Sequence, residues 1–175
     1  MSRVAILTAE QALEPARSTL RGVGKKMGKI PVLMGVLANA PPLLRGYLEL
    51  HGAVAAGKLD PAIRERIAVA VASHNDCHHC LVAHTEFGRA AGLSDDELQA
   101  ARVWSSSSSQ AQAALTLARA MLITAGHVGD GIISKAREVG LDDEAIVEIA
   151  VVVGMNQLTN MVNNLTVTVE SRMIA

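Results

Sequence analysis

The stretch LDPAIRERIAVAVASHNDCHHCLVAH, residues 59–84, decides the fold class of this chain. Asp60 is a good helix N-cap and Pro61 suits the first helical position, so a helix is expected to start at this point. Residues 67–72 are apolar on every side, and a helix that is apolar all round is buried. We therefore expect a central buried helix, followed by a second helix that carries both cysteines of the chain.

The second helix of this stretch has a recognisable start and end. Asn75 and Asp76 are both good N-caps, so the helix is expected to begin at one of them. Gly92 is a good C-terminal stop. Just beyond it, SDDE at 94–97 fits a capping box, with serine at the cap and glutamate three positions on.

The rest of the chain also divides into helices. Pro31 and the APP segment at 40–42 break the N-terminal third into short helices. Five serines at 105–109 predict an exposed linker between two halves. Helical patterns then occupy residues 110–126, 131–140 and 142 onward. No strand periodicity and no glycine-rich nucleotide loop is present, so the predicted fold class is all-α.

The amino-acid composition and net charge limit the classes of function that this protein can have. The 175 residues suffice for a single domain, spanning 1–175, with one core. With 16 basic and 17 acidic residues the net charge is −1, which offers no electrostatic case for binding nucleic acid or an anionic membrane. Half of the residues are hydrophobic, yet only one Trp, one Tyr and one Phe occur. Such small apolar side chains favour close-packed helices and hint at burial between subunits.

No signal peptide and no apolar run of about 18 residues is visible, so a cytoplasmic location is expected. In that compartment two cysteines are typical of catalysis or metal binding rather than of a structural disulfide.

A weak internal repeat links the two halves of the sequence. The segments GLSDDEL from Gly92 and GLDDEAI from Gly140 are similar, and residues 140–170 are a possible degenerate second copy of a helical unit. When Glu65 is aligned with Glu148, asparagines stand at 160 and 163 in place of the two cysteines. The alternative is that such helix starts are simply common.

The two cysteines form a CxxC pair with a histidine on the same helical face. Cys77 and Cys80 are three residues apart, and His84 follows Cys80 by four, so the three side chains share one face of a helix. The cap at residue 75 or 76 would put Cys77 in the first turn, where the helix dipole favours a thiolate. One sulfur can attack an oxidant and the second can resolve the product as a disulfide.

Two other interpretations of the cysteines remain. Together with two histidines among 74, 78, 79 and 84 they could bind zinc, although structural zinc sites usually draw on two separated ligand pairs. They could also be inert buried thiols. His51 and His127 are isolated and are interpreted as surface residues.

The CxxC motif and the residues around it resemble those of a known protein family. ERIAVAVASHNDCHHCLVAH, residues 65–84, resembles the alkyl hydroperoxidase D (AhpD-like) branch of the carboxymuconolactone decarboxylase superfamily. The shared pattern is a glutamate twelve residues before the first cysteine of C-x-H-C-x-x-x-H, and the flanking segments GKIP and FGRAAGLSDDEL agree with it. The resemblance implies an AhpD-like helical bundle.

The resemblance also implies roles for five residues of this chain. Cys80 would be the peroxidatic cysteine and Cys77 the resolving one, while Glu65 and His84 would form a proton relay. The middle histidine of the motif is His79, whose side chain points roughly away from the shared face on an ideal helix. His74 and His78 have no support from the motif.

The sequence therefore predicts a peroxiredoxin-type alkyl hydroperoxidase that needs no cofactor and no metal. An external dithiol protein, thioredoxin-like or lipoyl-bearing, would reduce its disulfide. The resemblance further implies a homo-oligomer, a trimer or a hexamer. Alternatives are a protein thiol-disulfide oxidoreductase with little peroxidase activity, and a metal-stabilised helical module without catalysis. The decarboxylases of the superfamily lack the CxxC pair.

Overall fold

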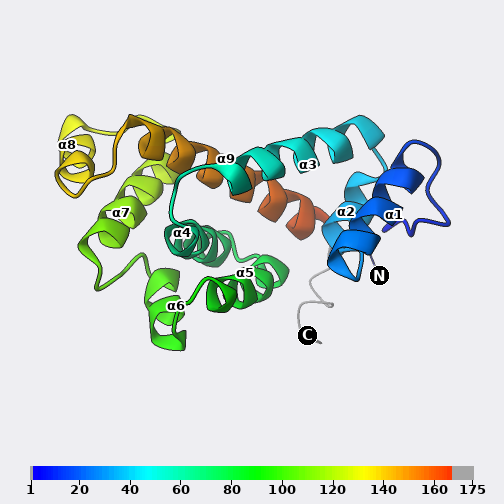
Figure 1. Ribbon diagram of the computed structural model, residues 1–175, viewed down its shortest axis with the longest axis horizontal. Coiled ribbons are helices and arrows are strands. Elements are labelled where there is room, and N and C mark those ends of the chain that lie inside the picture. Colours follow the sequence, from blue (N-terminus) through cyan, green and yellow to red (C-terminus); the bar gives the residue numbers. More distant parts are fainter. Residues whose placement is uncertain (1, 167–175) are drawn as a thin grey trace. The chain divides into compact units, whose positions relative to one another are not determined.

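The computed structural model describes residues 2–166, and every regular element within that range is an α-helix (Figure 1). The all-α prediction is confirmed. In chain order the helices are α1 (Ala16–Met27), α2 (Val32–Leu37), α3 (Pro41–Ala56), α4 (Pro61–His74), α5 (His78–Ala90), α6 (Asp95–Arg102), α7 (Ser109–Thr124), α8 (Asp130–Glu138) and α9 (Asp143–Thr166).

These helices form two compact units. The first contains α1, α2, α3 and the end of α9 from Met161, and the second runs from Gly57 to Asn160. The division does not fall at the serine run of residues 105–109, which lies wholly inside the second unit. That run is also shorter as a loop than expected, because Ser108 caps α7 and Ser109 is its first residue.

In the first unit, prolines end and start the short helices as predicted. Pro31 is the N-cap of α2, and Pro41 is the first residue of α3. Leu20 of α1 and Leu44 of α3 are fully buried in a core cluster that also includes Met34 of α2. The packing of these helices around the shared apolar cluster holds the first unit together.

The second unit is built around α4, which packs against α5, α6 and α7, while α7 in turn packs against α8. Every residue from Ile67 to Ala72 is at most 1% exposed. The predicted central buried helix is thus confirmed. Burial of a run of this kind removes apolar surface from water at roughly 25 cal/mol per Å², and so supplies much of the unit's stability.

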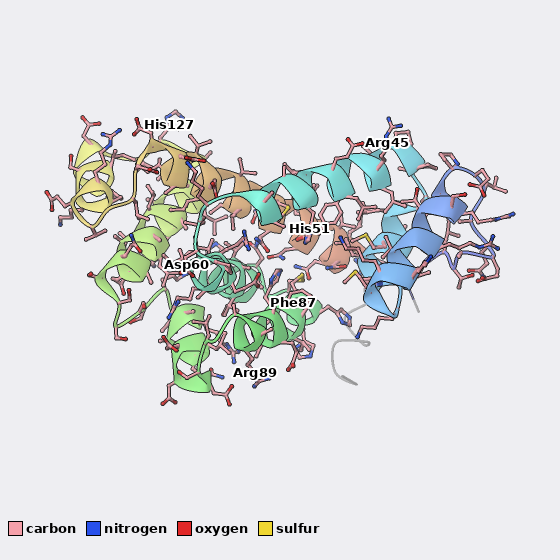
Figure 2. All side chains as sticks on the ribbon, in the orientation of Figure 1. Arg45, His51, Asp60, Phe87, Arg89 and His127 are labelled. Carbon is pink, nitrogen blue, oxygen red and sulfur yellow. A yellow bond between two sulfur atoms is a disulfide. The ribbon has the colours of Figure 1, made fainter. Side chains whose placement is uncertain are left out.

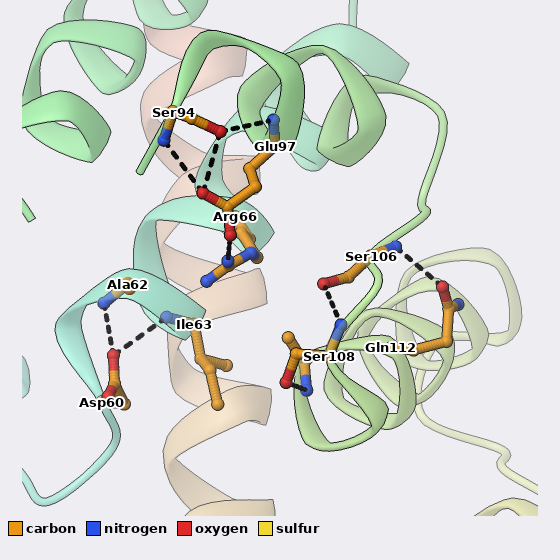
Figure 3. A network of polar contacts seen from close by, with 10 residues as sticks. Asp60, Ala62, Ile63, Arg66, Ser94, Glu97, Ser106, Ser108 and Gln112 are labelled. Carbon is orange, nitrogen blue, oxygen red and sulfur yellow. Dashed lines mark hydrogen bonds and ion pairs between the residues drawn. The ribbon is translucent and has the colours of Figure 1, made fainter. Parts of the chain in front are cut away.

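Two predicted helix starts are confirmed in atomic detail (Figure 3). Asp60 Oδ1 accepts hydrogen bonds from the backbone N–H groups of Ala62 (2.6 Å) and Ile63 (3.4 Å). Ser94 and Glu97 form a reciprocal capping box at the start of α6. These bonds satisfy N–H groups that have no partner within their own helices.

Helix α9 continues without a break where a second copy of the cysteine unit was considered. Asn160, aligned with Cys77 in that repeat, lies within the continuous helix, whereas Cys77 follows a turn. Residues 167–170 of the possible repeat lie outside the described residues. Within the described range, α9 is the one helix that is long and apolar enough to cross a membrane by length and composition, and 33% of its apolar window is buried. A single helix of this kind is weak evidence for a membrane span.

Candidate active site

The turn that joins α4 to α5 positions the two cysteines. The Asn75 N–H donates to the carbonyl of Val71 (3.0 Å), and the Cys77 N–H donates to the carbonyl of Ala72 (2.9 Å). Asp76 lies between them with φ of 50°. The three residues 75–77 therefore reverse the chain, and α5 returns along α4.

The predicted start of α5 at Asn75 or Asp76 is wrong. Cys77 is the N-cap, and α5 begins at His78. The reason is that Asn75 ends α4 and turns its side-chain amide toward α9, while Asp76 adopts the left-handed conformation. Consequently Cys80, the third helical residue, occupies the first turn that had been expected for Cys77, and the unpaired N–H groups of that turn favour a thiolate there.

Cys77 and Cys80 are joined by a disulfide with a Cα–Cα separation of 5.3 Å. Both residues are buried, at 1% and 4% exposed. They pack in one small cluster with Ala72 of α4, and Leu81 lies against it. The two sulfurs therefore lie in a small apolar cluster.

His84 and Glu65 form a pair between the two helices. The Nδ1 atom of His84 lies 2.8 Å from Glu65 Oε2. The two side chains are 22% and 16% exposed, so both are largely withdrawn from water. If Nδ1–H donates to the carboxylate, the neutral imidazole presents Nε2 as a proton acceptor.

His84 lies one helical turn after Cys80 on α5, on the face predicted from the spacing. Its ring also contacts the edge of Phe87 at a centroid distance of 5.8 Å. Phe87 is 49% exposed and projects from α5 (Figure 2). The dithiol, the imidazole and the carboxylate thus come from two adjacent helices and can support thiol deprotonation.

The other histidines differ from this pair. His79 is exposed, and its ring lies 6.2 Å from that of His78, which is half-buried. His74, exposed at the end of α4, contacts the ring of Trp104. His51 and His127 are exposed as well. Among the described residues, no group of three or more His, Cys, Asp or Glu side chains is arranged to hold a metal ion.

The structure also brings in residues that the sequence had not indicated. Arg66 of α4 is only 7% exposed and pairs with Glu97 of the α6 capping box (Figure 3). The side chain of Asn75 reaches Gln157 and Asn160 of α9. More than 80 residues separate those partners along the chain, so no local pattern could have predicted the contact.

Part of the chain is similar to a known protein family. Residues 41–122 match the carboxymuconolactone decarboxylase family. No curated protein matches the chain.

Three solved structures share the fold. A peroxidase-related protein with an alkylhydroperoxidase AhpD core from Ralstonia eutropha JMP134 has a TM-score of 0.83 at 24% identity, over 94% of this chain and 90% of that one. A peroxidase-related protein from Silicibacter sp. TM1040 has a TM-score of 0.78 at 22% identity, over 94% and 90%. The debrominase Bmp8, in complex with 2,3,4-tribromopyrrole, has a TM-score of 0.74 at 21% identity, over 94% and 89%.

The family match includes Glu65, the CxxC pair and His84, and the structural likeness extends over nearly the whole chain. The chain is therefore similar to the carboxymuconolactone decarboxylase family over residues 41–122, and it has the AhpD-like helical fold.

Proposed function

We propose that this protein is a dithiol peroxidase that reduces alkyl hydroperoxides. The observation that carries the proposal is the CxxC pair at the start of α5, one turn before a histidine that is paired with a carboxylate from α4. A thiolate is the reactive form of cysteine, and this arrangement supplies both a helix N-terminus and a proton acceptor for it.

In the first half-reaction the Cys80 thiol gives its proton to His84, directly or through a water, and Glu65 stabilises the imidazolium. The thiolate attacks the terminal oxygen of the hydroperoxide, and the O–O bond breaks. The alkoxide leaves as an alcohol after it takes up a proton, and Cys80 becomes a sulfenic acid. The sulfur loses two electrons, which the peroxide gains.

In the second half-reaction the Cys77 sulfur attacks the Cys80 sulfenic acid. Water leaves and the Cys77–Cys80 disulfide forms, which is the state that the structure contains. A cytoplasmic dithiol protein, thioredoxin-like or lipoyl-bearing, then reduces the disulfide by thiol-disulfide exchange. The cycle requires neither metal nor bound cofactor. His79, exposed on α5, takes no part in the proton transfer proposed here.

The alternative substrate is a protein disulfide, with the same dithiol as reductant. Burial of both sulfurs restricts the approach of a protein disulfide and of the protein reductant alike, so the oxidation of the dithiol by a hydroperoxide is what distinguishes the two substrates. The debrominase among the structural neighbours also makes 2,3,4-tribromopyrrole a reasonable third oxidant to assay.

We place the enzyme in a homo-oligomer, a trimer or a hexamer. The apolar composition and the many exposed large apolar side chains, Leu43, Val103 and Ile123 among them, support this arrangement. Sedimentation equilibrium is expected to give a mass of three or six chains. A mass of one chain at micromolar concentration would exclude the oligomer.

Thiol counting after one equivalent of cumene hydroperoxide tests the peroxidase proposal. The reduced wild-type protein is expected to lose both thiols, and Cys77→Ser to yield a sulfenic acid that dimedone traps. Cys80→Ser is expected to keep its thiol. If the wild-type thiols survive peroxide yet exchange readily with a protein disulfide, the protein is a thiol-disulfide oxidoreductase and not a peroxidase. Near-stoichiometric zinc on the purified protein would favour the metal-stabilised module instead.

A further inference from the structure

Beside the dithiol turn, the side-chain amide of Asn75 contacts two amide side chains of α9. We propose that this amide clamp, formed by Asn75, Gln157 and Asn160, is a positioning device that holds Cys77 beside Cys80 when the disulfide opens and so sets the redox equilibrium of the dithiol. The inference rests on the proposed use of the dithiol in catalysis, but it concerns residues outside the CxxC motif and the proton relay.

The contacts of the clamp are specific. The Nδ2 atom of Asn75 lies 2.6 Å from Gln157 Oε1 and 3.0 Å from Asn160 Oδ1. A primary amide nitrogen carries two hydrogens, so it can donate to both oxygens at once. Gln157 and Asn160 lie three residues apart on α9 and therefore on the same helical face. The clamp ties the end of α4 to α9 within the second unit.

The position of the clamp is what connects it to the cysteines. Asn75 begins the three-residue turn that ends at Cys77, and only Asp76 separates them. Asp76 has φ of 50°, a left-handed conformation that non-glycine residues adopt when the surrounding structure holds them. If the turn were released, relaxation at Asp76 would carry Cys77 away from Cys80.

One member of the clamp is buried where an apolar side chain would pack at lower cost. Asn160 is fully buried, and its Nδ2 atom has no hydrogen-bond partner among the described residues. A buried donor without a partner carries a free-energy cost that a leucine at this position would not incur. A role for the amide oxygen in holding Asn75 accounts for an asparagine at this costly position.

The clamp and the disulfide restrain the same turn, and this makes them thermodynamically coupled. Each restraint reduces the conformational freedom that the other must remove, so each stabilises the other by the same factor. Loss of the clamp must then weaken the disulfide relative to the dithiol. In the peroxidase cycle, the clamp would keep Cys77 in place while Cys80 is a sulfenic acid.

Equilibration of the full-length protein with glutathione measures this coupling. Two glutathione thiols supply two electrons and two protons, the Cys77–Cys80 bond breaks, and glutathione disulfide forms. The oxidised fraction is read by alkylation and mass spectrometry over a range of glutathione redox ratios. Gln157→Ala is expected to lower the equilibrium constant for disulfide formation about fivefold, the effect of one lost hydrogen bond. That change corresponds to a reduction potential about 20 mV less negative.

Two further variants separate positioning from general destabilisation. Gln157→Glu keeps an acceptor oxygen for Asn75, so its equilibrium constant for disulfide formation is expected to equal that of the wild type. Asn156→Ala removes a neighbouring buried amide on α9 whose side chain donates within its own helix, to Val152 O at 2.9 Å. The Asn156→Ala variant is expected to lower the melting temperature of the protein without changing the equilibrium constant for disulfide formation.

Three outcomes would overturn the clamp. The first is an equilibrium constant for disulfide formation in Gln157→Ala that lies within twofold of the wild-type value, and the second is a constant above that value. The third is an equal change of this constant in Asn156→Ala. Asn75→Ala provides a second measurement, since it removes both donor contacts and is expected to have the larger effect. No peroxide enters the titration, so its result is independent of whether hydroperoxides oxidise the dithiol.

Discussion

The Glu65–His84 pair is the residue-scale feature on which the proposed chemistry depends. A carboxylate largely withdrawn from water is stabilised when a neighbouring donor compensates its lost hydration, and in the tautomer that carries its hydrogen on Nδ1, His84 is such a donor at 2.8 Å. The same contact fixes the tautomer and orientation of the imidazole. Because the pair bridges α4 and α5, its geometry depends on the packing of two helices.

Replacing the members of this pair is expected to slow the oxidation of the dithiol. Positioned general bases typically accelerate a reaction about 10²–10⁴-fold, so His84→Gln should slow the loss of thiols to peroxide by roughly a hundredfold or more. Glu65→Gln keeps a hydrogen-bond acceptor but not the charge, and we expect roughly a tenfold loss. Stopped-flow measurement of thiol loss at fixed pH gives both rates.

Glu86→Gln is the matched control, because Glu86 lies on α5 but is 65% exposed and pairs with Arg89. Its rate should equal that of the wild type. Equal rates in His84→Gln and the wild type would instead mean that solvent takes the thiol proton.

At the scale of elements, the start of α6 combines a helix cap with a buried cation. Glu97 accepts hydrogen bonds from the Ser94 N–H (2.9 Å) and the Ser94 hydroxyl (3.0 Å), and it also pairs with Arg66. The Ser94 backbone bond first, and then its hydroxyl and the Arg66 charge, hold the pKa of Glu97 below its ordinary value of 4.5. Arg66 needs this partner, since its side chain is only 8% exposed.

This lowered pKa predicts an acid-sensitive contribution to stability. A carboxyl whose folded pKa lies below its unfolded value stabilises the fold above the unfolded pKa, and the contribution disappears as the pH falls through the folded pKa. Glu97→Gln should therefore be less stable than the wild type above about pH 5, and the difference should shrink in acid below 4.5. Urea unfolding across this pH range measures it.

Asp96→Asn, on the same exposed helix turn, controls for the change in net charge. A Glu97→Gln difference that is independent of pH would contradict the ionic origin of the effect.

Helix α2 in the first unit depends on the absence of a side chain at residue 35. A Cβ atom there would lie 2.8 Å from the Leu7 carbonyl oxygen and 2.9 Å from Ile6 Cγ2. The Leu7 N–H also donates to the Gly35 carbonyl at 3.0 Å, so the two segments cannot separate without the loss of that bond.

Gly35→Ala should therefore lower the free energy of unfolding by about 1–3 kcal/mol, the usual cost of overpacking. Gly46→Ala on α3, where a Cβ meets nothing within 4 Å, should instead be neutral or stabilise by up to about 1 kcal/mol through helix propensity. Chemical denaturation compares the two, and an equal effect of both would exclude the steric explanation.

At the scale of the whole molecule, the disulfide contributes little to keeping the chain folded. Its cysteines are three residues apart, and closing so short a loop restricts the unfolded chain by only about 2 kcal/mol in the chain-entropy estimate. The apolar core around α4 carries the fold instead. A dithiol that cycles between two redox states requires this independence.

Reduction should accordingly leave the far-UV circular dichroism spectrum unchanged and lower the melting temperature by no more than about 8 °C. The Cys77→Ser/Cys80→Ser double variant should behave like the reduced protein. Loss of helicity on reduction would identify the disulfide as a structural one and weaken its proposed redox role.

Local sequence determined the helices and the composition of the site. Apolar residues at 67–72 are buried, and Asp60 and Ser94 cap the helices that follow them. The spacing of Cys80 and His84 places them one turn apart on α5, directly after Cys77 at its N-cap. These features depend on residues within about one helical turn of each other, which is why they can be predicted from the chain.

Only the tertiary structure decided how the turn before the cysteines is built. The pattern favoured Asn75 or Asp76 as the cap of α5, but Asn75 finds its partners on α9, more than 80 residues away, and the cap moves to Cys77. Long-range contacts also placed Glu65 beside His84 and Arg66 beside Glu97. A local propensity of a few tenths of a kcal/mol to about 1 kcal/mol yields to such partly buried hydrogen bonds, and local sequence patterns do not reveal which distant side chain will supply them.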